Sequence, residues 1–201
     1  MSCKTRGIVV VGRGLICEPS DPSDTSPRSA ADRTRLQKAI EIIQYEGTDK
    51  IFFTGDTSAT RESLPATVAE CNANVLRLLR PVLSSTVSYR IIPGRNQYDQ
   101  CWNTCRIARR WKVCRLTVIA GPDYFNAFGA MWRRAGERND LCVSLITASD
   151  HQKPSEDPII DNHDIDRWDL FFARLATAGG RVGHYVASVL ADLRIRDSSR
   201  V

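Results

Sequence analysis

The chain has 201 residues and a net charge of only +5, with 28 basic side chains against 23 acidic ones. Hydrophobic residues make up 42% of it and charged residues 25%, which is ordinary for a globular protein that needs neither disulfides nor a metal to fold. Its apolar stretches are far too short to cross a bilayer and no signal-peptide core is present, so we expect no membrane partner and a cytoplasmic location.

Short β-branched runs alternate with segments of helical periodicity along the chain. We expect strands at residues 7–11, 50–54, 87–92, 115–120 and 143–147. We expect helices at residues 29–47, 65–79, 98–111 and 124–135, and a C-terminal helical region at 166–193 that breaks near Gly179-Gly180. This alternation predicts an α/β fold, a three-layer αβα domain around a mainly parallel, Rossmann-like sheet of about five strands.

The whole chain, residues 1–201, is interpreted as a single domain with a loop at 18–30 and an acidic loop at about 149–166. The segment Asp161-Asn162-His163-Asp164 has residue types that bind metals, but a polar loop is the favoured interpretation. The seven cysteines are odd in number and fit no disulfide or zinc template, so we expect buried or partly buried free thiols. Cys101 and Cys105 share one face of a predicted helix, but zinc would need two more ligands, and no metal is expected.

Small and polar residues end the first four predicted strands. They are Gly12-Arg13-Gly14, Thr54-Gly55-Asp56-Thr57, Gly94-Arg95-Asn96 and Gly121-Pro122-Asp123. The carboxyl ends of parallel strands meet at one edge, where such folds bind ligands, so we expect these segments to form one site. Glycines let a ligand approach the backbone, and the free N–H groups at the following helix starts favour an anion. Each segment taken alone also fits a plain strand-to-helix turn.

Basic residues gather at Arg106, Arg109, Arg110, Lys112 and Arg115. A solvated helix face and attraction to an anionic partner both remain open. Because no nucleic-acid motif or aromatic platform accompanies them, we do not expect nucleic acid as a partner. The four tryptophans fit packing positions better than stacking platforms.

Six segments resemble, in order, the motifs of one known family. They are a strand with a glycine turn at 8–14, an arginine on the first helix at 35–39, a strand with a polar end at 51–56, a helix-start glutamate at 69–70, an asparagine motif at 95–100, and a strand and helix at 116–136. Together these segments make residues 7–148 similar to the SanA/YdcF/ElyC family, with 149–201 as a C-terminal extension. The resemblance implies a divergent member of a family linked to bacterial envelope metabolism, some of whose members bind S-adenosylmethionine. Membrane members of that family carry an N-terminal anchor, which we do not expect here.

The chain departs from the family pattern at the candidate site. The family's histidine and arginine after the fourth strand correspond to Tyr124 and Ala127 here, and a motif glycine corresponds to Asp56. The family's threonine and second asparagine correspond to Gln97 and Gln100. The resemblance therefore implies an altered mechanism, with Tyr124 either replacing the histidine as a hydrogen-bond donor or simply packing.

The individual candidates each have a functional and a structural interpretation. Glu70 could act as a general base or complement a helix dipole, and Asp56 and Asp123 could form an acid/base pair or cap helices. Arg35 should reach an acidic partner or an anionic ligand, and Asn96 should bind a ligand or form a turn. The expected catalytic residues are Glu70, Asp56, Asp123 and Tyr124. The expected ligand-binding residues are Gly12, Arg13, Gly14, Arg35, Thr54, Gly55, Thr57, Arg95, Asn96, Asp99 and Gly121.

Three functions are consistent with this set. The first is a hydrolase or group transferase that acts on a polar, anionic small molecule of phosphorylated or nucleotide-like chemistry. The second is a non-catalytic module that binds a nucleotide or S-adenosylmethionine at the same edge. The third is a specialised biosynthetic enzyme with an altered site. The first is the favoured hypothesis, because the glutamate and asparagine are kept.

Overall fold

The computed structural model describes residues 5–12, 30–55, 73, 87–92, 97–148 and 167–178, together with 182–183, 185–187 and 189–190. The strands are β1 (Arg6–Val11), β2 (Lys50–Thr54), β3 (Ser88–Ile91), β4 (Arg115–Ala120) and β5 (Cys142–Thr147). The helices are α1 (Ala30–Glu46), α3 (Gln97–Arg110), α4 (Pro122–Arg138) and α5 (Arg167–Ala178). The predicted helix at 65–79 lies outside the described residues except for Ala73, which is helical and buried.

The five strands form one sheet in the order β3-β2-β1-β4-β5, and every neighbouring pair is parallel. The chain moves outward from β1 to β3, then returns across β1 to add β4 and β5 on the other side. The predicted three-layer α/β class with a parallel, Rossmann-like sheet is therefore confirmed. The order reverses between β1 and β4, the place where such sheets bind ligands.

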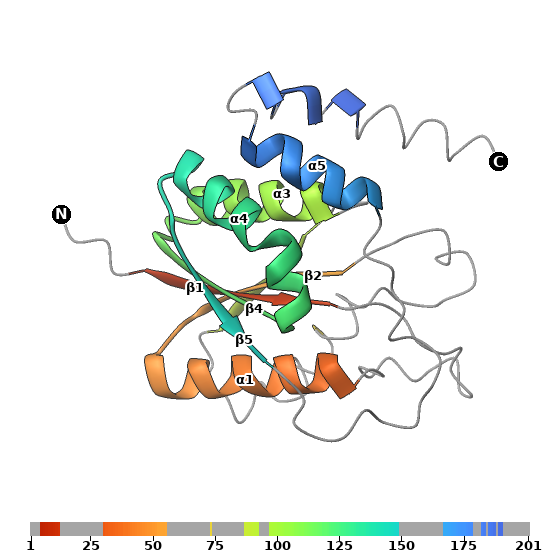
Figure 1. Ribbon diagram of the computed structural model, residues 1–201. Coiled ribbons are helices and arrows are strands. Elements are labelled where there is room, and N and C mark those ends of the chain that lie inside the picture. The colour runs from red at the N-terminus through yellow and green to blue at the C-terminus, as the bar shows by residue number, and fades with distance from the viewer. Residues whose placement is uncertain are drawn as a thin grey trace.

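The described helices lie on both faces of the sheet. Helix α1 packs on one face against Ile8, Val10 and Ile119, and α3 and α4 pack on the other against Val9, Val11 and Val118. Figure 1 shows α1 on one side of the sheet, α3 and α4 on the opposite side, and α5 lying beyond them. Phe172, Ala173 and Ala176 of α5 join the core cluster of α3 and α4, so α5 adds apolar packing outside the three layers.

The cysteine prediction is partly wrong. Cys101 and Cys105 are buried free thiols, as expected, and burial followed by the contact with Cys105 raises the pKa of the Cys101 thiol. This thiol therefore stays protonated and unreactive. Cys142 is free but exposed, because it begins an edge strand, and Cys114 is disulfide-bonded, which its sequence spacing did not indicate.

Among the described residues, no helix is both long enough and apolar enough to cross a bilayer.

Candidate functional site

Eight of the predicted site residues lie in the described part of the chain, and the sheet topology places seven of them at its carboxyl edge. Gly12 follows β1, Thr54 ends β2 and Gly55 follows it, and Gly121 follows β4. Asp99 lies in the first turn of α3, and Asp123 and Tyr124 lie in the first turn of α4. Parallel pairing of all five strands brings these helix starts and strand ends to one side. The eighth residue, Arg35, lies on α1 and reaches this edge through its hydrogen bond to the carbonyl oxygen of Val11.

The ladders of the central strands end at different positions at this edge. The ladder between β1 and β4 ends at Val10 and Ile119. The flanking ladders run one residue further, to Val11 with Thr54 on one side and to Ala120 with Thr147 on the other. We call the point where the β1–β4 ladder ends, at the reversal of the strand order, the crevice.

The side chain of Arg35 fills this crevice. It is only 3% exposed, and its Nη1 donates a hydrogen bond of 2.5 Å to the carbonyl oxygen of Val11, the last residue of β1. The prediction was an acidic partner or an anionic ligand, and a backbone carbonyl is one partner that the structure gives it. Because a guanidinium remains protonated even when buried, a fixed positive charge lies at the end of β1.

Gly121 leaves the room that this guanidinium occupies. Its backbone is extended, with φ −74° and ψ 163°, a conformation open to any residue. A β-carbon at this position would, however, lie 3.3 Å from Nη2 of Arg35. The absence of a side chain at the end of β4 is therefore explained by the close approach of Arg35 and not by a turn.

Thr54 places a buried hydroxyl beside the crevice. Its carbonyl oxygen accepts a hydrogen bond of 2.7 Å from the backbone N–H of Gly12, which ties the ends of β1 and β2 together. The residue is 0% exposed, and within the part of the chain that the structure describes its Oγ1 has no hydrogen-bond partner. Native proteins leave few buried polar atoms in this state.

Tyr124 connects α4 to the start of α3. Its hydroxyl accepts a hydrogen bond of 3.0 Å from the indole N–H of Trp132 and donates one of 3.0 Å to Oε1 of Gln97. The indole nitrogen can only donate, so the single hydroxyl proton of Tyr124 must point to Gln97. Its ring also packs 5.0 Å from that of Phe128. Tyr124 therefore packs in the core and donates its proton within the protein, while its role in place of the family's histidine stays a prediction.

The two described carboxylates of the site lie at helix starts. Asp123 is exposed in the first turn of α4, and Asp99 is half-buried in the first turn of α3. The N-cap of α4 is Gly121, so the alternative in which Asp123 caps this helix is wrong; proline follows at the first helical position and displaces Asp123 into the turn. A negative charge there still complements the helix dipole.

Seven predicted site residues lie outside the described residues. They are Arg13, Gly14, Asp56, Thr57, Glu70, Arg95 and Asn96. The proposed pair of Asp56 and Asp123 and the role of Glu70 therefore stay predictions. Among the residues that are described, no group of three or more His, Cys, Asp or Glu side chains is arranged to hold a metal.

Sequence reasoning missed two members of the polar network, Gln97 and Trp132. Trp132 was expected only to pack, and it is fully buried, but it also fixes the direction of the Tyr124 hydroxyl. Trp132 lies eight residues after Tyr124 on the same helix, outside the three- and four-residue spacing at which helical neighbours meet, so the spacing gave no signal for this contact. Nothing in the sequence links Gln97 to them, because that contact joins different helices.

Comparison with family models, with curated proteins and with solved structures gives no match. The similarity to the SanA/YdcF/ElyC family therefore stays a prediction from motifs, and the chemistry has to be argued from this chain's own residues.

Proposed function

We propose that the carboxyl edge of the sheet binds a polar, anionic small molecule of phosphorylated or nucleotide-like chemistry, and that the protein hydrolyses it or transfers a group from it. The observation that carries the proposal is the buried Arg35 guanidinium at the end of β1, in the crevice where the strand order reverses. A guanidinium at the position where such sheets bind ligands favours an anionic ligand there.

The surroundings of the crevice support an anionic ligand over a cationic one. Helices α3 and α4 begin at this edge, and the N-terminus of a helix attracts negative charge. Arg13 and Arg95 are proposed to add charge from the turns after β1 and β3. The described acids, Asp99 and Asp123, occupy helix starts, where the helix dipole offsets their charge.

The chemical step is assigned to carboxylates of the same edge. Glu70 is the proposed general base or orienting group, with Asp56 and Asp123 as further acid or base candidates. Tyr124 is less suited to proton transfer than expected, because its proton is directed to Gln97 and its oxygen accepts from Trp132. It is better suited to fixing the starts of α3 and α4 relative to each other.

That same network favours a second candidate, a non-catalytic binding module. Tyr124 stands where the similar family has a histidine, and a tyrosine engaged within the protein cannot replace a titrating imidazole. S-adenosylmethionine is the cofactor to test in this case, because the resemblance implies it. The cytoplasmic location also stays a proposal, and it has to be measured by cell fractionation, since a disulfide such as that of Cys114 is unusual in a reducing compartment.

Ligand screening followed by product analysis separates the two candidates. The full chain is tested by thermal shift with adenosine monophosphate, glucose 6-phosphate and S-adenosylmethionine, and each hit is incubated and analysed for products. An enzyme converts a stabilising compound, and Glu70→Gln abolishes conversion while binding is kept. The matched control is Glu137→Gln, which removes an exposed carboxylate at the far end of α4. Stabilisation without conversion favours the binding module, and no stabilisation by any of the three compounds contradicts both.

A further inference from the structure

The hydroxyl of Thr54 lies beside the charged crevice. Thr54 is the last residue of β2 and pairs in register with Val11, whose carbonyl oxygen accepts the hydrogen bond from Arg35. Side chains alternate along a strand, so Thr54 lies on the same face as Phe52, which belongs to the core under α3 and α4. Adjacent strands are about 4.8 Å apart, so the hydroxyl is one strand away from the guanidinium's anchor.

This hydroxyl is excluded from water without gaining a protein partner. Thr54 is 0% exposed, and no hydrogen bond to its Oγ1 is found in the described part of the structure. The backbone carbonyl of the same residue is satisfied by Gly12, so only the side chain is left over. A valine would fill the same space without the cost of burying a hydroxyl, which means that folding alone does not explain the threonine.

We infer that Thr54 Oγ1 donates a hydrogen bond to an anionic oxygen, phosphoryl or carboxylate, of a small molecule bound over the carboxyl ends of β1 and β2. The inference rests on the proposed function and narrows its ligand. Hydrogen bonds from a hydroxyl to an ionised oxygen are short and strong, and the positive charge of Arg35 at the neighbouring strand end favours the same oxygen. An apolar group at this point would leave the hydroxyl unsatisfied, and a cationic group, which could donate to its oxygen, would be repelled by the charge of Arg35.

The test compares Thr54→Val with Thr54→Ser in the full chain. The probes are glucose 6-phosphate and adenosine monophosphate as phosphate monoesters and S-adenosylmethionine as a carboxylate, with glucose and adenosine as uncharged counterparts. We expect Thr54→Val to raise the Kd of the anionic probe that binds most tightly by about ten- to a hundredfold. This is the range for losing a hydrogen bond to a charged group. Thr54→Ser keeps the hydroxyl and most of the affinity. The ligand-free melting temperature of Thr54→Val should equal or exceed that of the wild type.

The matched control is Thr117→Val, which removes a hydroxyl from β4 that is hydrogen-bonded to Ser144 and should leave affinity unchanged. If Thr54→Val binds the probes with wild-type affinity, the hydroxyl does not contact the ligand. That result overturns the inference and leaves the proposed function standing. A lower ligand-free melting temperature in Thr54→Val also overturns it, because the hydroxyl would then be structural. If no anionic probe stabilises the wild type, the proposed function fails and the inference fails with it. The probe that responds to Thr54→Val identifies the oxygen as phosphoryl or carboxylate.

Discussion

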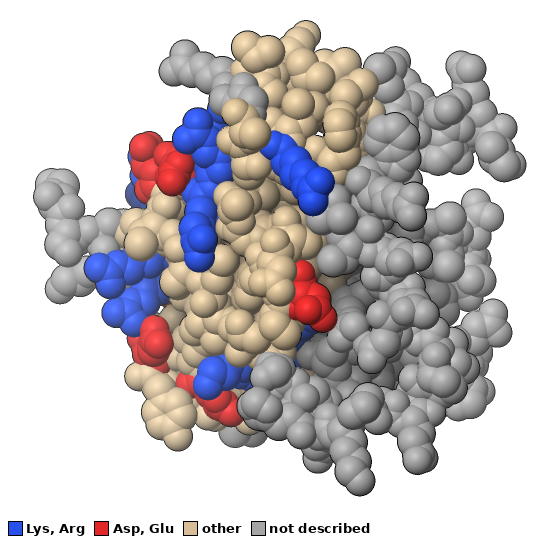
Figure 2. Space-filling model, viewed as in Figure 1, with Lys and Arg blue, Asp and Glu red and all other residues tan. Residues whose placement is uncertain are grey.

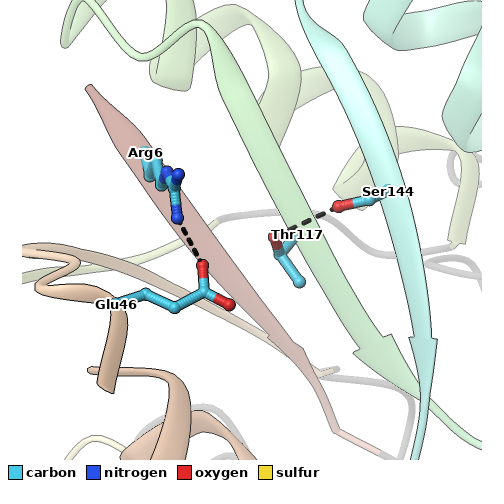
Figure 3. Close-up of polar contacts among 4 residues, drawn as sticks. All are labelled: Arg6, Glu46, Thr117 and Ser144. Carbon is cyan, nitrogen blue, oxygen red and sulfur yellow. Dashed lines mark hydrogen bonds and ion pairs between the residues drawn. The ribbon is translucent and has the colours of Figure 1, made fainter. Parts of the chain in front are cut away.

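The amino edge of the sheet, where the parallel strands begin, differs from the carboxyl edge, where they end, in how far its polar side chains are exposed. At the amino edge, β1 and β4 begin with exposed arginines, Arg6 and Arg115, which are register partners. Arg6 forms an ion pair of 2.6 Å with Glu46 at the end of α1, and Thr117 of β4 hydrogen-bonds Ser144 of β5 at 3.2 Å (Figure 3). Figure 2 shows basic side chains over the side where the strands begin, with acidic ones beside them.

At the carboxyl edge several polar groups are buried instead, although Asp123 is exposed. Arg35 and Thr54 are excluded from water, and the hydroxyl of Tyr124 is held between Trp132 and Gln97. Exposed charges change the free energy of folding only slightly, because water solvates them in the folded and the unfolded chain alike. Buried polar groups are costly unless they are hydrogen-bonded, so substitutions at them should change stability more than substitutions at the amino edge. The following predictions test that contrast, from the largest effect to the smallest.

Arg35→Met should have the largest effect on stability. It leaves the carbonyl oxygen of Val11 without its guanidinium donor in the crevice, so we expect the free energy of unfolding to fall by about 3 kcal/mol in urea titration. Arg35→Lys keeps a charge but not the planar fork, and should lose less. Equal stability of Arg35→Met and the wild type would show that the guanidinium is not needed to close the crevice.

Tyr124→Phe should lower the free energy of unfolding by about 2 kcal/mol. The buried indole N–H of Trp132 loses the hydroxyl as acceptor, and Oε1 of Gln97 loses the hydroxyl as donor. Chemical denaturation measures the change. The control is Tyr45→Phe, at a side chain that is 87% exposed and should stay near wild-type stability. If both variants behave alike, the network between α3 and α4 does not form in solution.

Gly121→Ala should lower the free energy of unfolding by about 1 kcal/mol or less. The effect is small because the new β-carbon meets only the end of the Arg35 side chain, which can shift. A double-mutant cycle measures the coupling: in the Arg35→Met background the cost of the alanine should largely disappear. A cost that is the same in both backgrounds would mean that the space at Gly121 serves some other neighbour.

Glu46→Gln should have the smallest effect, within about 0.5 kcal/mol, since both members of its pair with Arg6 are close to half exposed. What effect there is should vanish at high salt. A salt-independent loss well above that size would contradict the contrast between the two edges.

Much of the fold could be predicted because periodicity is local. The strands at Lys50–Thr54 and Arg115–Ala120 have the predicted bounds, and the parallel sheet follows from alternation. The helix expected to stop near Gly136 continues to Arg138. Gly136 lets α4 pack tightly on β5, since a β-carbon there would lie 2.3 Å from Cγ2 of Val143. Close packing between elements, which the chain's local pattern does not encode, explains this glycine.

The candidate site could be predicted only as far as topology goes. The position of Gly12, Thr54 and Gly121 at one edge follows from parallel strands. The bond of Arg35 to Val11 joins residues 24 apart, and that of Tyr124 to Gln97 joins residues 27 apart. Such partners depend on how helices dock on the sheet, so the sequence indicated the residue types but not their pairing.

The most direct test of the central claim is a titration of the isotope-labelled full chain with adenosine monophosphate, followed by backbone amide NMR. The account predicts chemical-shift changes that centre on Gly12, Thr54, Gly55 and Gly121, at the carboxyl edge. Changes that centre on Arg6, Lys50 and Arg115, at the amino edge, would contradict it, because the exposed charges and not the buried ones would then be binding the anion.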